Sequence, residues 1–460
     1  MMTKKTTDTL IYKAFALSLP CFCISMSTGC SDSEDQTETG DTDESEGSDN
    51  DGSDDDSDDD SDDDSDDDSD DETDDETDDE TDDETDDGTD DNSGPIENYP
   101  VLTGACDLPE AEPTRLAVSS TDKSTGAVSL VSVADKTVKK DLALAKTDIA
   151  LAVNGDQLYS INRFGFDYID ILDLNDELAP LAQFSVAIEE DRSSNPYSLH
   201  VSASDEAYIA LFGDDSLQVF DVSDVTKPEK LRDVDFSHFS DADGIPEAGK
   251  MIACGDVLFV GVEALDRDNG WVPVDGTRLV PVQTGSDRLY DWDSDHQGAD
   301  GVKLLGLGIK SVRADPDDSS GQSVLVLSSG LERVNLATGT SEWVIKDTTF
   351  ADKGHGRFQL RSFDLHSDGS LYFAIATADF SEHGLYRASL TDEGADLEAV
   401  FTGLQTVTGG LEVIGDELWF VDTTEGDSGI RIFDISQDTV TEIGTAISTG
   451  LPPYGFLPLP

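Results

Sequence analysis

The sequence predicts an all-β fold over residues 101–460, a seven-bladed β-propeller. Three observations lead to this prediction. This part of the chain reads as short strands of alternating apolar and polar residues separated by Gly/Asp turns, and no segment keeps a helical period over three turns. One strand–turn–strand unit recurs along it. The two ends of the segment supply complementary parts of one further unit.

The recurring unit is a strand, a tight Gly/Asp turn, and a second strand that opens on an aromatic residue. It is clearest in Val153–Tyr159, Ala253–Phe259 and Val413–Trp419, with looser copies at Ser204–Tyr208 and Ser367–Tyr372. A third strand follows several of the copies. Such a unit is typical of one four-stranded propeller blade.

The spacing of the turns predicts the number of blades. They fall near residues 155, 204, 255, 320, 368 and 415, and the longest interval is interpreted as holding an insertion between Asp266 and Asp300. Residues 115–141 look like the second to fourth strands of a seventh blade, and Pro453–Leu457 echoes the inner strand that begins at Pro196. We therefore expect the C-terminal strand to complete the N-terminal blade, which removes exposed sheet edges. Six or eight blades remain open alternatives.

Acidic residues dominate the chain. Residues 31–100 carry 39 Asp and Glu and no Lys or Arg, and residues 101–460 carry 62 acidic against 25 basic residues. The formal net charge of the whole chain is −74. Such a surface repels polyanions, so nucleic acid and anionic membrane surfaces are not expected as partners. Cations, basic proteins or neutral glycans suit it better.

Residues 30–100 are predicted to form a disordered tether. From Ser53 the chain repeats Ser-Asp-Asp-Asp, and near Glu72 it switches to Glu-Thr-Asp-Asp until about Asp91. Repeats without an apolar member cannot bury a core, and their like charges extend the chain. The segment is interpreted as a solvated stalk that lifts a domain away from a membrane. Loose collection of Ca²⁺ by the polyanion is the alternative.

Residues 1–29 are predicted to be a signal peptide. Lys4, Lys5 and Lys13 form its positive region, and Ala14–Met26 is its apolar region. The apolar region is too short to span a bilayer comfortably, which favours a cleaved signal over a membrane helix.

The segment Ser27–Cys30 resembles the lipobox of bacterial lipoproteins. Ser27 departs from the family pattern, which usually has Leu there. The resemblance implies that Cys30 is lipidated and anchors the chain in the membrane, since three acyl chains hold far more firmly than one. Ser31 after the cysteine favours the outer membrane, with the domain facing the surface or the periplasm. Ordinary secretion with cleavage nearby is the alternative.

Two segments resemble the repeats of bacterial surface propellers. Ser216–Pro228 is similar to the LVIVD repeat, and Asn195–Tyr197 is similar to the start of YVTN-type repeats. The resemblance covers most of residues 110–460 and is specific to the fold. Members of this broad group range from adhesive or scaffold domains to lactonases, so it implies no single activity.

Cys106 and Cys254 are the two cysteines that remain for the mature domain. Two cysteines in an exported chain permit one disulfide. Cys254 lies beside Gly255 at a strand–turn position, and Cys106 lies on the segment that leads to the first blade. Two separate thiols are the alternative.

No established catalytic motif is present. The six histidines are scattered without an HxxxH or HExxH pair, the mature chain has no CxxC, and there is no Gly-x-Ser-x-Gly elbow. His355 beside Arg357 could enter a central pocket, although a satisfied loop histidine is the plainer interpretation. We therefore predict no catalytic and no cofactor-binding residue.

The best candidate metal site is an alternating acidic run. Asp291, Asp293 and Asp295 alternate along the chain, and Asp300 follows. Ca²⁺ requires hard oxygen ligands that converge from a tight turn. The glycine and the last acidic residue are displaced from the EF-hand pattern, so a solvated insertion loop is the alternative. Ca²⁺ is the only cofactor that the sequence suggests.

These observations favour a lipid-anchored cell-envelope protein that presents a propeller to a protein, glycan or envelope partner. The predicted stalk supports this hypothesis, because presentation at a distance matters most for contact. A lactonase-like or other hydrolytic propeller enzyme with a site in the central channel is the alternative, and a purely structural envelope component is a third. Carboxylates around the axis with a bound metal would favour the enzyme, whereas a merely polar channel would favour binding.

Overall fold

The structure of the chain is a computed structural model. It describes residues 102–106, 112–188, 192–274, 276–290, 300–352, 356–357, 359–377, 381–391, 394–404 and 409–460. Cys30, the predicted signal peptide and the predicted tether lie outside these residues. No helix in the described part of the chain is long and apolar enough to cross a membrane.

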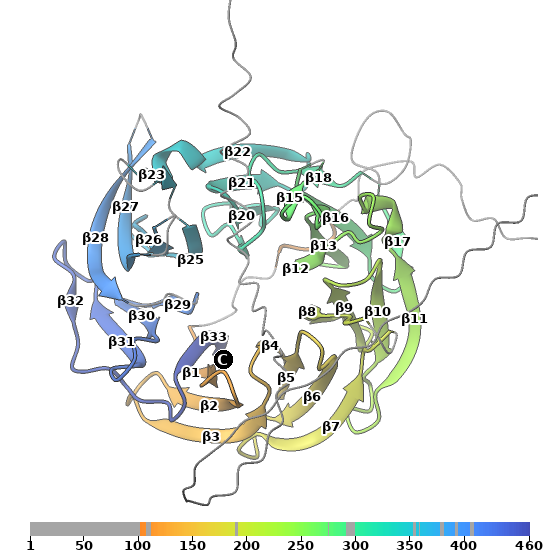
Figure 1. The fold of residues 1–460 in the computed structure, drawn as a ribbon, viewed down its shortest axis with the longest axis horizontal. Coiled ribbons are helices and arrows are strands. Elements are labelled where there is room, and N and C mark those ends of the chain that lie inside the picture. Colours follow the sequence, from red (N-terminus) through yellow and green to blue (C-terminus); the bar gives the residue numbers. More distant parts are fainter. Residues whose placement is uncertain are drawn as a thin grey trace, which may run out of the picture. The chain divides into compact units, whose positions relative to one another are not determined.

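The described residues form seven antiparallel sheets, the blades, which stand around one central axis (Figure 1). In each blade the strands run in order from the axis to the rim. Blade one is β33 (Pro453–Leu459), β1 (Arg115–Thr121), β2 (Gly126–Ser132) and β3 (Val138–Ala145); blade two is β4 (Ile149–Asn154), β5 (Gln157–Asn162), β6 (Tyr168–Asp173) and β7 (Ala179–Ser185). Blade three is β8 (Pro196–Val201), β9 (Glu206–Leu211), β10 (Ser216–Asp221) and β11 (Glu229–Asp235); blade four is β12 (Ala248–Cys254), β13 (Val257–Val262), β16 (Arg278–Gln283) and β17 (Arg288–Leu289).

The remaining three blades follow the same order. Blade five is β19 (Ser311–Ala314), β20 (Ser323–Leu327), β21 (Leu331–Asn335) and β22 (Thr340–Ile345); blade six is β25 (Gln359–Leu365), β26 (Leu371–Ala376), β27 (His383–Thr391) and β28 (Gly394–Leu404). Blade seven is β29 (Leu411–Ile414), β30 (Glu417–Asp422), β31 (Gly429–Asp434) and β32 (Thr441–Glu442). Smaller elements are β18 (Val302–Lys303), which pairs with β16, the hairpins β14 (Leu265–Asp266) with β15 (Val272–Pro273) and β23 (Ala351–Asp352) with β24 (Gly356–Arg357), and 3-10 turns at Ser237–Phe239 and Asp347–Phe350.

The ring closes as the sequence predicts. The C-terminal strand β33 pairs antiparallel with β1, with Arg115 opposite Leu459 and Ala117 opposite Leu457. β33 thereby becomes the inner strand of the blade whose other three strands come from the N-terminal side. The count of seven blades is confirmed, and six or eight are excluded.

The predicted inner turns are confirmed, and the predicted insertion in blade four is corrected. Gly155, Gly255 and Gly415 have φ values of 54°, 64° and 57°, a left-handed conformation that residues with a Cβ rarely adopt. However, residues 266–300 are not one insertion. Residues 278–283 are the third strand of blade four, and extra chain lies on both sides of it. This strand was missed because its neighbours in sequence carry the turn residues of an extended loop.

Burial explains the strand pattern. The second strand of each blade is packed between neighbouring blades, so it reads as an apolar run instead of an alternating one; all six residues of β13 and of β26 are buried. Within the described residues, seven hydrophobic clusters each fill the space between two adjacent blades. The aromatic residues that open these strands are fully buried there, including Tyr159, Phe259 and Trp419. The rim strands, such as β11, are mostly exposed and charged.

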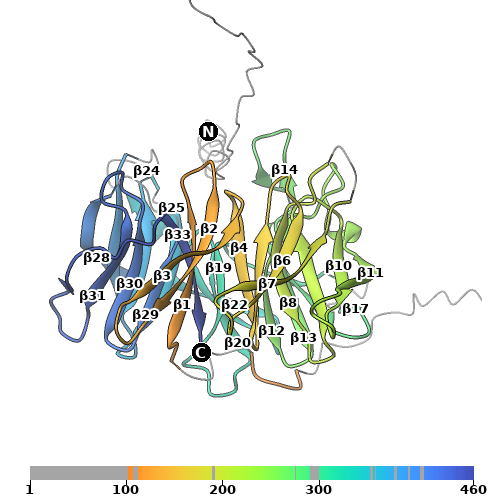
Figure 2. The same ribbon diagram turned by 90° about the horizontal axis from the view of Figure 1, so that it is seen from below.

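The propeller has two distinct ends. All inner strands begin at the upper end in Figure 2 and finish at the lower end, where the chain also ends after β33. Residues just before an inner strand or just after a second strand therefore lie at the upper end, and the Gly/Asp turns lie at the lower end.

A short N-terminal segment is attached to the lower end. Cys106 and Cys254, the last residue of β12, form a disulfide bond. The backbone N–H of Cys106 also donates to the carbonyl oxygen of Gly321 (2.7 Å). The Thr103 hydroxyl donates to the Asp256 carboxylate (2.5 Å). Residues 102–106 are thus fixed to blades four and five before the chain reaches β1.

Candidate functional site

A cavity of about 510 Å³ lies among the inner strands of blades one to four. Its lining comes from β33, β4, β8 and β12, and it includes Tyr197, His200 and Lys250. The neighbouring inner-strand positions carry small or apolar side chains, such as Ala150 and Ala152, which leave the space open. The cavity is within the size range of small-molecule pockets in proteins.

Arg163 lies at the upper end of this channel, directly after β5. Its guanidinium donates from Nε to Oδ1 of Asp148 (3.0 Å), and from Nη2 to the same oxygen. The guanidinium also stands 4.8 Å from the centre of the Tyr197 ring. Asp148 precedes β4 and Tyr197 is the second residue of β8, so the ring geometry brings three separate segments together. Burial acts to lower the pKa of Arg163, but Asp148, Tyr197 and Tyr454 together outweigh it, so this pKa is raised.

Lys250 is the third residue of β12 and lies against the other side of this group. Its Nζ is 5.2 Å from the centre of the Tyr197 ring. Burial, together with the nearby cations Arg163 and Lys310, lowers the pKa of Lys250 to about 8. The side chain is surrounded by protein yet keeps part of its surface accessible, because it borders the cavity. A lysine held in this way sits among groups that disfavour its charge.

Glu263 is the carboxylate that partly offsets these cations. It follows β13 and accepts a hydrogen bond from the backbone N–H of Ile309 (2.9 Å). Burial raises its pKa, while Lys310 and Lys250 act in the opposite direction. Neither lysine forms an ion pair with any carboxylate in the described part of the chain. The charges are therefore near one another without direct neutralisation.

Tyr454 and Arg361 complete the ring of polar groups. Tyr454 is the second residue of β33, and it interacts electrostatically with both Arg163 and Arg361. Burial lowers the pKa of Arg361, the third residue of β25. We name Asp148, Arg163, Lys250, Glu263, Lys310 and Arg361 the cationic cluster. It contains four basic and two acidic groups.

A second charged group faces the channel from blades five to seven. Arg313 on β19 donates from Nη2 to the Glu412 carboxylate on β29 (2.6 Å) and from Nη1 to Asp364 on β25. Asp364 also accepts from the backbone N–H of Val413 (2.7 Å). Burial raises the pKa of Glu412, and Arg313 opposes that rise. We name Arg313, Asp364 and Glu412 the acidic triad, because two carboxylates share one cation.

Exposed aromatic residues lie beside the cationic cluster. Phe164 and Phe166 follow Arg163 in the loop after β5, and they are 63% and 40% exposed. The Lys146 Nζ stands 4.8 Å from the centre of the Phe166 ring. On blade four, the Arg267 guanidinium is 5.0 Å from the Trp271 ring centre. The upper end thus presents apolar ring faces together with positive charge.

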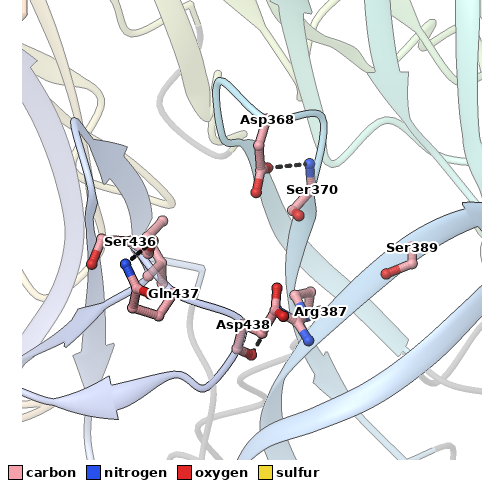
Figure 3. Close-up of a pocket in the computed structure, with 8 residues that line it drawn as sticks. Asp368, Ser370, Arg387, Ser389, Ser436, Gln437 and Asp438 are labelled. Carbon is pink, nitrogen blue, oxygen red and sulfur yellow. Dashed lines mark hydrogen bonds between the residues drawn. The ribbon is translucent and has the colours of Figure 1, made fainter.

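A groove at the lower end, between blades six and seven, is of a different kind (Figure 3). Its volume is about 310 Å³, and its lining is polar. Arg387 donates to the carbonyl oxygen of Asp438 (3.0 Å) and to the Glu398 carboxylate (2.6 Å). Asp368 accepts from the backbone N–H of Ser370 (2.8 Å). Arg387 and Asp368 thus already have protein partners, which is typical of a solvated surface groove.

The residues predicted as sites from the sequence fall largely outside the described ranges. Asp291, Asp293 and Asp295 lie outside them, as do Cys30 and His355. Asp300 is described, and its carboxylate is 3.9 Å from Nη1 of Arg278. No group of three or more candidate metal ligands occurs among the described residues. The Ca²⁺ site therefore stays a prediction.

The cationic cluster was missed at the sequence level. Its members lie between residues 148 and 361 and converge only when the ring is built. One signal was present: Lys250 and Arg361 interrupt inner strands whose neighbours are apolar or small. A second was misjudged, because the Pro-Tyr echo at Tyr197 and Tyr454 was interpreted only as the start of a strand.

Fold and channel together define a seven-bladed β-propeller with a charged central channel. No family model and no curated protein matches the chain. A protein from Lactobacillus plantarum of solved structure is 15% identical, with a TM-score of 0.53 over 75% of this chain and 99% of that one. A candidate 6-phosphogluconolactonase from Bacteroides fragilis is 13% identical, with a TM-score of 0.52 over 76% and 99%. One from Bacteroides uniformis is also 13% identical, with a TM-score of 0.52 over 75% and 99%. At these identities the likeness extends to the fold alone.

Proposed function

We propose that this protein is a ligand-binding β-propeller, lipid-anchored through Cys30 in the bacterial outer membrane, and that it binds a glycan of the cell envelope at its upper end. The observation that carries the proposal is the pairing of exposed rings with the channel opening. Phe164 and Phe166 are exposed directly beside Arg163. Flat aromatic faces offer a large apolar contact that the C–H faces of sugar rings can cover.

The anchoring half of the proposal is tested on the full chain. Cells that express it are fed a palmitate analogue, and labelled protein is recovered from the membrane fraction. We expect label on the wild type and none on Cys30→Ser. Equal labelling of the two chains would contradict lipidation at this residue.

The binding half is tested on the Cys30→Ser chain, with immobilised envelope polysaccharide. The double variant Phe164→Ser/Phe166→Ser is expected to lose most of the retention. Leu231→Ser/Leu390→Ser is the matched control, because those side chains are 46% and 51% exposed on β11 and β27, away from the upper-end rings. Retention that falls equally in both variants, or in neither, would contradict binding at the upper end.

A lactonase-like hydrolase is the second candidate. Two similar structures are named as candidate 6-phosphogluconolactonases. Lys250, with its pKa near 8, and the half-buried Glu263 are also groups of the kind that transfer protons in enzymes. A panel of sugar lactones separates the two candidates. Hydrolysis by the wild type that Lys250→Met abolishes would favour the enzyme, whereas no hydrolysis above the uncatalysed rate favours binding.

A further inference from the structure

The charge balance of the cationic cluster differs from that of the other arginine clusters in the described part of the chain. Five other arginines each meet two or three carboxylates; these groups are Arg232 with Glu206 and Asp287, Arg267 with Asp243 and Glu247, Arg313 with Asp364 and Glu412, Arg333 with Asp315 and Glu342, and Arg431 with Asp422, Asp427 and Glu442. Arg192, Arg278 and Arg387 each meet one. Carboxylates are in surplus over residues 101–460, so this saturation is the common outcome. Around Lys250 the ratio is reversed, because three basic groups, Arg163, Lys250 and Lys310, lie near two carboxylates, Asp148 and Glu263.

This surplus of positive charge destabilises the free protein. Lys250 is held near Arg163 and Lys310, and both lower its pKa. Like charges at short range in a partly desolvated channel repel one another strongly. An arrangement that disfavours its own charges is more typical of a ligand site than of a structural element. A bound negative group would supply the missing counter-charge.

The cavity limits the size of that group's carrier. About 510 Å³ accommodates a small molecule and not a folded partner. The acidic surface adds a second limit, because 62 acidic residues against 25 basic ones repel a polymer of negative charges as it approaches. At physiological salt this repulsion is screened over about 8 Å, so a compact anion is affected far less than a long one.

We propose that the upper end of the central channel binds a small molecule through one oxyanionic group, a carboxylate or a phosphate, which contacts Lys250 and is held by the positive field of Arg163 and Lys310. The Tyr197 ring, against which Lys250 and Arg163 both lie, forms one wall of the site. This inference rests on the proposed function, since it assigns the ligand chemistry at the same end of the propeller. An acidic sugar would fit both the proposed glycan ligand and the proposed anion site.

The test is calorimetric titration of the full chain carrying Cys30→Ser, at low ionic strength and pH 7. The probes are glucuronate, glucose 6-phosphate, glucose, and polygalacturonate as a polymeric anion. We expect at least one anionic sugar to bind and glucose to bind at least tenfold more weakly. The polymer should also be weaker per sugar unit. Comparison of the two anionic sugars then identifies the preferred group, carboxylate or phosphate.

Variants assign the binding to the channel. Lys250→Met and Lys310→Met should each weaken anion binding about tenfold or more, and Lys250→Gln keeps the test valid if the methionine perturbs folding. Lys139→Met is the matched control, because it removes the same charge from an exposed ion pair with Glu177 on the rim. Lys139→Met is expected to change affinity less than twofold.

Protonation of Lys250 provides an independent readout. Arg163, Lys310, Glu263 and Tyr197 face this lysine. The pKa of Lys250 is lowered to about 8, so affinity should fall as pH rises through about 8. Near pH 8 the binding heat should depend on the ionisation enthalpy of the buffer, because protons are taken up. This buffer dependence should be absent in Lys250→Met.

The outcomes separate this inference from the proposed function. No binding of either anionic sugar, or equal losses in Lys250→Met and Lys139→Met, would overturn the anion site. If envelope polysaccharide is still retained in that case, the proposed function stands without it. If anions bind and Phe164→Ser/Phe166→Ser leaves polysaccharide retention intact, the glycan proposal fails and the anion site stands.

Discussion

The cationic cluster and the acidic triad face the same channel, but they differ in whether their charged groups are neutralised by direct partners. In the triad, Arg313 binds both Asp364 and Glu412, so every charged group has a direct partner. In the cationic cluster Arg163 has a direct ion pair with Asp148, whereas Lys250 and Lys310 form none with the described residues, and Lys250 borders open space. Both groups are built on inner strands and the loops next to them, so the fold alone does not dictate the difference.

This contrast separates a structural role from a binding role. A cluster that neutralises itself ties adjacent blades together and offers little to a ligand. A cluster that keeps surplus positive charge loses stability in the free protein and gains it when an anion arrives. Four substitutions test this distinction, and their expected effects decrease from the first to the last.

Arg313→Met should cause the largest loss of stability. It leaves Asp364 and Glu412 buried beside each other without a cation, and removing one partner of a buried ion pair costs about 3 to 5 kcal/mol. Because Arg313 is itself one-third exposed, we expect about 2 to 3 kcal/mol at pH 7, measured by urea unfolding. Anion binding at the upper end should stay within twofold. A stability change below about 0.5 kcal/mol, the usual range of surface substitutions, would remove the structural role of the triad.

Glu412→Gln should reveal the pH dependence of the triad. The pKa of Glu412 is raised in the folded state, chiefly by burial, above its ordinary 4.5. The folded protein therefore holds this proton more tightly than the unfolded chain, and stability falls as pH rises from 4.5 through the raised pKa. The free energy of unfolding of the variant lacks this decrease. The difference between variant and wild type should therefore grow with pH, in favour of the variant, to about 1 kcal/mol. Parallel stability curves for the two proteins would contradict this assignment.

Lys250→Met should have a small effect on stability, of the opposite sign to Arg313→Met. The variant removes a charge that Arg163, Lys310 and burial disfavour, so we expect no loss at pH 7 and a gain of less than about 1 kcal/mol. The pKa of Lys250 is lowered from 10.5 to about 8 on folding, so wild-type stability gains a contribution as pH rises between these values. Thermal unfolding at pH 7 and pH 9.5 should show this gain in the wild type only. A loss of more than about 1 kcal/mol in the variant would make Lys250 a structural residue.

Glu263→Gln should produce the smallest effect, a gain in anion affinity of about threefold at pH 6.5. It removes a carboxylate that competes with the ligand for Lys250 and Lys310. The gain is small because the charge of Glu263 is partly screened. The pKa of Lys250 should fall further, since Glu263 is the group that raises it. Titration at pH 6.5 avoids loss of the lysine charge. Weaker binding in the variant would indicate that Glu263 contacts the ligand directly.

The sequence predicted the fold far better than the site. Each blade has a local signal, because Gly155, Gly255 and Gly415 must turn with positive φ and the strand after each turn must fill an interface between blades. The pairing of β33 with β1 was also predictable, because the N-terminal blade lacked an inner strand and the C-terminal strand lacked a blade of its own. Local patterns are sufficient for this fold because the same unit is repeated.

The cationic cluster could not be predicted in this way. Arg163, Lys250 and Lys310 belong to three blades, and their proximity depends on where each inner strand begins along the axis. A shift of one residue in a strand would turn its side chain to the opposite face. Composition gave no signal either, because an overall charge of −74 does not show where the few basic residues gather.

The disulfide between Cys106 and Cys254 determines how the propeller carries mechanical load. A pull on the chain before Leu102 enters the ring at the end of β12 in blade four, and the closing strand β1 lies beyond that junction. In the reduced protein the same pull would run on to β1, whose pairing with β33 keeps the ring closed. The disulfide thus diverts a pulling force to blade four and protects the pairing of β1 with β33.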